Sequence, residues 1–217
     1  MNNEEKHVDT GKVKEAVKKA VEEGKDIRDE VRDITMEALS KGHLEMERIK
    51  TVVTSVWDGA KEGVGSESEE IKQSFKEVMS GLDEALEKSA HASKLAIEET
   101  VGKVKDFSQE DLKRAIDDLK GLEEMLLDTV TEVAKSSKST VADVLHDTVV
   151  HAKNSGTEVG QQVLKDIEYL RNKLEENSKE TLKTVSHAAT NFTADVADAA
   201  SGILAGIADS LKKPKNK

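Results

Sequence analysis

Residues 13–38 read VKEAVKKAVEEGKDIRDEVRDITMEA and indicate the fold class of the chain. Apolar or small residues recur in this stretch at alternating steps of four and three, with charged residues between them. They are Val13, Val17, Ala20, Gly24, Ile27, Val31, Ile34 and Ala38. A 3.5-residue period over more than three heptads is typical of a helix with one apolar stripe, and it excludes a strand. We expect one helix here, ending near Lys41-Gly42, where glycine can form a cap.

Two further stripes follow in the first half of the chain. Apolar residues between 44 and 60 predict a second helical segment, which runs into the glycine-rich stretch 59–68, the predicted hinge. Ser66 and Glu69 then have the S-x-x-E spacing of a capping box, which predicts a new helix start before the stripe at 71–104.

A second break is predicted at Ser108. Asp111 follows Ser108 by three residues, and Phe107 and Leu112 have the spacing of a hydrophobic staple. The helix that starts there is expected to run to Asn154-Ser155-Gly156. A last stripe, between Val163 and Ile207, predicts the final helix.

These stripes predict an all-α fold: an elongated, coiled-coil-like bundle of four to five long amphipathic helices, antiparallel to one another. Helices of about 40 to 50 residues would be roughly 60–75 Å long. The expected division of the chain is a disordered N-terminus (1–10), the elongated bundle (11–183), an Ala-rich C-terminal helix continuous with the last bundle helix (184–211) and a basic tail (212–217).

Composition and charge exclude several classes of protein. The chain has 33 basic and 44 acidic residues, for a net charge of −11, with no cysteine, one proline and few aromatic residues. Without cysteine there is no disulfide framework and no thiolate site. The acidic balance argues against nucleic-acid binding. The polar N-terminus shows no signal peptide, and no run of 18 uncharged apolar residues is present, so we expect a cytoplasmic protein.

The composition changes between Thr184 and Leu211. This stretch has no lysine or arginine, three aspartates and many alanines, and it ends in a tail with four lysines. Gly202 and Gly206 form a G-x-x-x-G pair, which in membranes allows helices to approach closely. One interpretation is a self-association face or a surface anchor, and the alternative is an Ala-rich helix packed in the bundle. The residues predicted for self-association or surface contact are Ala199, Gly202, Ile203, Gly206, Ile207, Lys212, Lys213 and Lys215.

Histidine and carboxylate pairs are the remaining candidates for chemistry. Asp143, Asp147 and His151 fall at i, i+4 and i+8, with His146 beside them, so one helix face could present a metal site. A di-iron bundle, however, needs a Glu-x-x-His on each of two helices, and the chain has this spacing only at Glu4 and His7. Nucleotide-binding and hydrolase motifs are absent as well. We therefore predict no metal site, no cofactor and no enzymatic activity.

Three segments resemble a known family. GKDIRDEVRDITMEAL at 24–39 is similar to the opening motif of an uncharacterised bacterial family of helix-only proteins. GLDEAL at 81–86 and DLKRAIDDL at 111–119 strengthen the resemblance, which covers the chain up to about Leu174 and leaves the Ala-rich end outside. The family has no assigned activity, so the resemblance implies an all-helical fold and no site residues.

Two looser resemblances are compositional. The chain resembles phasins, helical proteins that coat polyester storage granules, in its amphipathic helices, scarce Cys and Pro, and Ala-rich end with a lysine tail. KEAVKKA at 14–20 is similar to late-embryogenesis-abundant stress proteins.

These observations predict a non-enzymatic structural or interaction protein. It would self-associate as a homo-oligomer, or coat a lipid or storage-granule surface, through its C-terminal helix. A stress-protective chain that folds only on drying or binding is the alternative, and a metal-dependent helical-bundle enzyme is a remote one.

Overall fold

The computed structural model describes residues 9–41, 44–103, 109–178 and 192–211. Within these ranges the chain forms eight helices and no strand. The helices are α1 (Thr10–Glu23), α2 (Ile27–Ser40), α3 (Met46–Gly63), α4 (Ser68–Lys103), α5 (Gln109–Lys135), α6 (Ser139–Ser155), α7 (Glu158–Ser178) and α8 (Phe192–Leu211). The all-α fold class is confirmed, but the prediction of four to five helices is wrong, because several predicted helices are interrupted.

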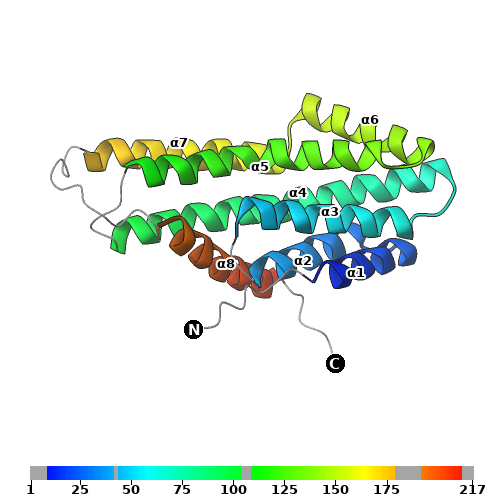
Figure 1. The fold of residues 1–217 in the computed structure, drawn as a ribbon, viewed down its shortest axis with the longest axis horizontal. Helices are drawn as coiled ribbons and strands as arrows, with labels where there is room; N and C mark the ends of the chain where they lie inside the picture. Colours follow the sequence, from blue (N-terminus) through cyan, green and yellow to red (C-terminus); the bar gives the residue numbers. More distant parts are fainter. Residues whose placement is uncertain (1–8, 42–43, 104–108, 179–191, 212–217) are drawn as a thin grey trace.

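The bundle is elongated and built around α4 (Figure 1). This helix has 36 residues, which corresponds to about 54 Å at the helical rise. It packs against α2, α3, α5, α6, α7 and α8. In Figure 1, α5, α6 and α7 lie along one side of α4, and α1, α2 and α8 lie on the opposite side. No described helix reaches the 40 to 50 residues that the stripes predicted.

One connected apolar core holds these helices together. Its two large aromatic residues are Trp57 of α3 and Phe75 of α4, which are both fully buried. Their rings meet edge to face, with centroids 5.6 Å apart and an interplanar angle of 89°, the arrangement that aromatic pairs prefer. The first predicted stripe also faces this core, since Val17 and Val31 are fully buried.

The first predicted helix is two helices, α1 and α2. Gly24 has a φ of 64°, in the left-handed region, and its N–H donates to the carbonyls of Ala20 (3.2 Å) and Val21 (3.1 Å), so it caps α1. Asp26 also has a positive φ, of 50°. Glycine adopts this conformation without the strain that a Cβ brings. The stripe continues across the break because Gly24 occupies one of its positions.

The predicted hinge at 59–68 is shorter than expected. Gly59 and Gly63 lie inside α3, and only residues 64–67 separate α3 from α4. A Cβ at Gly59 would overlap the carbonyl oxygen of Lys14, and a Cβ at Gly63 would lie 2.5 Å from that of Lys18. These glycines therefore let α1 and α3 pack with their backbones close together, rather than forming a joint.

The third predicted helix, expected from Ser108 to Asn154, is divided into α5 and α6. The described part of α5 begins at Gln109, and the predicted start at Ser108 lies outside the described residues. The helix ends at a serine pair: the N–H groups of Ser136 and Ser137 bond to carbonyls three residues back, and both hydroxyls donate to the carbonyl of Val133 (2.9 and 2.7 Å). Serine side chains that compete for backbone carbonyls favour such helix ends. After this turn α6 runs back along α5 (Figure 1).

The last predicted helix is described in two parts. α7 ends at Ser178, and α8 begins at Phe192. α8 packs against α2, α4 and α5, and Figure 1 shows it across α4 from α7. The predicted continuity between the last bundle helix and the Ala-rich helix falls on residues 179–191, which lie outside the described residues.

Candidate functional site

The Ala-rich helix α8 lies on the flank of the bundle. Its inner face carries Val196, Ala200, Leu204 and Ala208, which are all buried in the core. The N–H of Leu44 donates to the carbonyl of Ala197 (3.2 Å) and ties α8 to the segment before α3. The apolar face of α8 is therefore occupied within the chain.

The structure places five of the eight predicted contact residues on α8. Gly202 and Gly206 are exposed. Ala199, Ile203 and Ile207 are half-buried at the edge of the core. Together these five residues form one side of the helix, which we call the α8 ridge. The predicted lysines, Lys212, Lys213 and Lys215, lie outside the described residues.

The two glycines of the α8 ridge differ from those of the G-x-x-x-G pair at Gly59 and Gly63. At Gly59 and Gly63 of α3, an added Cβ would meet the backbone of α1. At Gly202 and Gly206, an added Cβ would have nothing within 4 Å. Nothing in the described part of this chain therefore explains why positions 202 and 206 lack a side chain.

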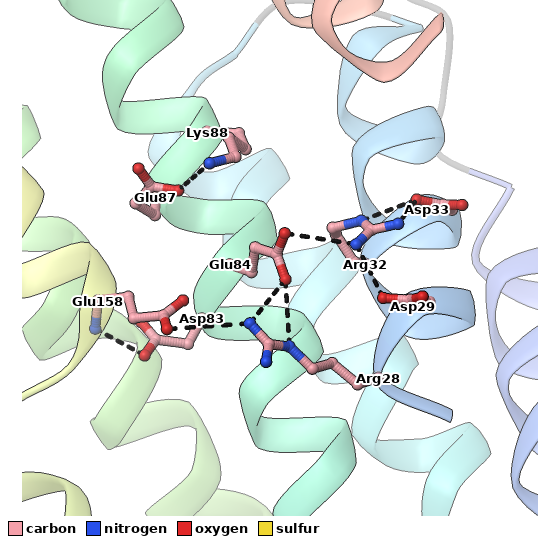
Figure 2. Close-up of polar contacts among 9 residues, drawn as sticks. All are labelled: Arg28, Asp29, Arg32, Asp33, Asp83, Glu84, Glu87, Lys88 and Glu158. Carbon is pink, nitrogen blue, oxygen red and sulfur yellow. Dashed lines mark hydrogen bonds and ion pairs between the residues drawn. The ribbon is translucent and has the colours of Figure 1, made fainter. Parts of the chain in front are cut away.

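A charge cluster joins the first two motifs that carry the family resemblance (Figure 2). Both oxygens of the Glu84 carboxylate in α4 are engaged: Arg28 Nη2 lies 3.0 Å from Oε2, and Arg32 Nη1 lies 3.4 Å from Oε1. Asp29 and Asp33 hold the same Arg32 guanidinium at 2.9 and 2.8 Å. A carboxylate shared by two arginines fixes the register of α2 on α4, although partly exposed ion pairs add little stability.

Two other residues of the 81–86 motif, Gly81 and Asp83, contact neighbouring helices. A Cβ at Gly81 would lie 2.5 Å from the carbonyl oxygen of Arg28, so glycine lets α4 approach α2 closely. Asp83 points to α7 instead and accepts hydrogen bonds from the N–H groups of Glu158 (2.7 Å) and Val159 (2.9 Å). Burial raises the pKa of Asp83, while these two bonds oppose the rise. Sequence reasoning missed this cap because its donor and acceptor are about 75 residues apart.

A second buried carboxylate lies between α4 and α7. Asp166 of α7 is 4% exposed; its Oδ1 accepts from Gln162 Nε2 (2.9 Å), and its Oδ2 is buried without a hydrogen-bond partner. Burial raises the pKa of Asp166, against the lowering effects of Gln162, His91 and Lys94, and Glu87 adds to the rise. The charged form is thus disfavoured in the folded chain.

Folding should therefore be coupled to protonation of Asp166. A carboxyl whose pKa is raised on folding stabilises the folded state at low pH, and this contribution is lost as the pH rises through the folded-state pKa. The variant Asp166→Asn cannot ionise at this position. We expect its free energy of unfolding to exceed that of the wild type by more at about pH 7 than at about pH 4. Denaturant unfolding of both chains at the two pH values measures this, because other carboxylates cancel in the difference. An equal difference at both pH values would contradict the prediction.

The histidine and carboxylate face that sequence analysis singled out lies on α6. All four side chains are exposed. Asp147 and His151 line a groove between α4 and α6, and Asp143 and His146 do not line it. Among the described residues, no group of three His, Cys, Asp or Glu side chains is arranged to hold a metal ion.

None of the described helices combines the length and the apolar character that crossing a bilayer requires. The fold is that of an elongated all-α bundle organised by α4, with a small-residue helix on its flank, so the class is a helical-bundle protein. The chain belongs to a family of unknown function (DUF6781), which matches residues 3–213. No curated protein and no solved structure matches it.

The family match confirms the resemblance to an uncharacterised family. It also reaches further than the motifs predicted, since residues 3–213 include the whole of α8. The comparisons give no support to the resemblance to phasins. The α8 ridge thus lies within the family's shared region and not in an appended tail.

Proposed function

We propose that this chain is a non-enzymatic interaction protein that self-associates through the α8 ridge. The observation that carries the proposal is the open space over Gly202 and Gly206. Glycine inside a helix is about 1 kcal/mol less favourable than alanine, so two exposed helical glycines weaken α8 with no gain inside the chain. A second helix packed closely on the ridge would explain why glycine occupies positions 202 and 206.

The same chain shows how such a pair works. The backbone of α1 lies against Gly59 and Gly63, at a distance that a Cβ would forbid. The α8 ridge has the same spacing, with Ile203 and Ile207 beside the glycines as apolar contacts. Copies of one chain most often associate through a two-fold axis, in which the same surface serves both partners. Two α8 ridges packed on each other satisfy this geometry.

Coating of a lipid or granule surface is less well supported than self-association. A surface-lying helix needs a free apolar face, but Leu204 and Ala200 are almost completely buried against the bundle. Binding to a lipid or granule surface through that face would first require α8 to leave its place on α2 and α4. Association through the ridge requires no such change.

Bulky side chains on the ridge test the proposal. We expect the wild-type chain to reach at least twice the mass of one chain as its concentration rises, and Gly202→Leu with Gly206→Leu to stay at the mass of one chain. Light scattering coupled to size-exclusion chromatography measures this. Because nothing lies within 4 Å of either added Cβ, the variant should fold, and circular dichroism confirms that.

Gly11→Leu is the matched control. Gly11 is also an exposed glycine in a helix, and a Cβ there would meet only Asp9 at 3.6 Å, an ordinary contact. This variant should associate as the wild type does. Equal association of all three chains, or a wild type that stays monomeric, would refute self-association through the ridge.

A further inference from the structure

A groove of about 410 Å³ lies between α4 and α6, and the turn before α7 lines one end. Its volume falls within the range of about 300–1,000 Å³ that small-molecule sites occupy. The groove is separate from the α8 ridge, and none of its lining residues belongs to α8.

Ionisable side chains face the groove from both walls without pairing. Lys72 and Lys76 line it from α4, and Asp147 and His151 line it from α6. None of these four side chains makes a hydrogen bond or an ion pair with any described residue. Opposite charges thus stand on facing helices but remain apart.

Facing charges elsewhere on the bundle do pair. Lys14 of α1 lies 2.7 Å from Glu62 of α3, and Lys50 of α3 lies 3.3 Å from Glu132 of α5. Long lysine side chains on adjacent helices therefore reach their carboxylate partners in this fold. In the groove between α4 and α6, the exposed side chains of Lys72, Lys76 and Asp147 make no such pair, so their charges are open to a bound molecule.

The surface between the charges is apolar in part. Met79 of α4 and Ala152 of α6 line the groove and are almost fully buried. Asp83 also lines it, at the α7 end, where both carboxylate oxygens already accept backbone N–H groups. A simple anion would be repelled by Asp147 and Asp83, and a simple cation by Lys72 and Lys76.

We propose that this groove binds a small zwitterion of the amino-acid type with a short aliphatic chain. Lys72 and Lys76 hold the anionic group through charge-assisted hydrogen bonds, and Asp147 holds the cationic group. The aliphatic part lies on Met79 and Ala152. The two charges of such a ligand pair with the lysines of α4 and with Asp147 of α6, which do not pair with each other.

Three related probes test this on the full chain. Norleucine carries both charges, hexanoate keeps its carboxylate without the amine, and pentylamine keeps its amine without the carboxylate. The reporter is the methyl signal of Met79 in a chain with ¹³C-labelled methionine methyl groups, identified by its loss in Met79→Leu. We expect norleucine to shift this signal in a saturable way, and each of the other probes to bind about tenfold more weakly or worse, because each lacks one charge-assisted contact.

Charge-removing variants provide the control. Lys72→Gln with Lys76→Gln should weaken norleucine binding by about tenfold or more. Lys135→Gln with Lys165→Gln, which alters two exposed lysines outside the groove, should leave it unchanged. Three results would overturn the proposal: no probe shifts Met79, hexanoate or pentylamine binds as tightly as norleucine, or the first variant binds norleucine as the wild type does.

Discussion

Phe75→Ala is expected to lower the free energy of unfolding by about 3–5 kcal/mol, the usual range for removing a buried phenylalanine. Phe75 is fully buried on the central helix α4, and its ring meets Trp57 of α3 edge to face. The substitution removes this contact and leaves a cavity in the core. Denaturant unfolding followed by circular dichroism measures the loss.

Leu164→Ala is the control for this prediction. Leu164 is 70% exposed on α7, so its removal should change the free energy of unfolding by no more than about 0.5 kcal/mol. If Phe75→Ala changed stability as little as Leu164→Ala, then the packing of α3 on α4 around these two aromatic rings would be wrong.

Gly59→Ala should also destabilise the chain, by about 1–3 kcal/mol, although alanine favours helices more than glycine does. The added methyl group would overlap the Lys14 carbonyl oxygen in the backbone of α1. A backbone atom cannot move aside as a flexible side chain can, so α1 must shift away from α3. Thermal or denaturant unfolding measures the effect.

Gly202→Ala is the matched substitution at the G-x-x-x-G pair of α8. Its methyl group would have nothing within 4 Å inside the chain, so at concentrations where the chain is monomeric it should raise stability by up to about 1 kcal/mol. Opposite signs for the two substitutions are the expected result. If Gly59→Ala were stabilising as well, α1 would not pack on α3 at the distance described.

The 3.5-residue period predicted the core residues of α1, because burial of one face is a local property of a helix. In α2 it was less accurate, since Met36 and Leu39 are fully buried outside the stripe and Ile34 within it is only half-buried. It could not predict where helices end inside a stripe. Gly24 occupies a stripe position and still breaks the helix through its positive φ. Ser136 and Ser137 end α5 by bonding their hydroxyls to Val133, and serines are also common on exposed helix faces.

Contacts between segments far apart in the chain could not be predicted from the sequence. The cap that Asp83 provides for α7, and the carboxylate of Glu84 shared by Arg28 and Arg32, join residues more than 50 positions apart. The motifs that contain these residues were recognised, but their roles depend on which helices become neighbours.

The α8 ridge shows the same limit. The G-x-x-x-G spacing predicted a close-packing face on the Ala-rich helix, and the structure places that face at the surface. The spacing at Gly59 and Gly63 looked like a hinge, yet this pair packs against α1 inside the chain. Only the arrangement of the helices distinguishes a pair that is already occupied from one that is open.

Disulfide cross-linking at position 206 tests the α8 ridge most directly, because the chain has no cysteine of its own. Two ridges packed on each other bring the two copies of residue 206 close together, and a disulfide requires Cα atoms within about 4.4–6.8 Å. Under mild oxidation, Gly206→Cys should therefore form covalent dimers readily, whereas Gly11→Cys should form few. Equal cross-linking at the two positions, or none at position 206, would contradict association through the α8 ridge.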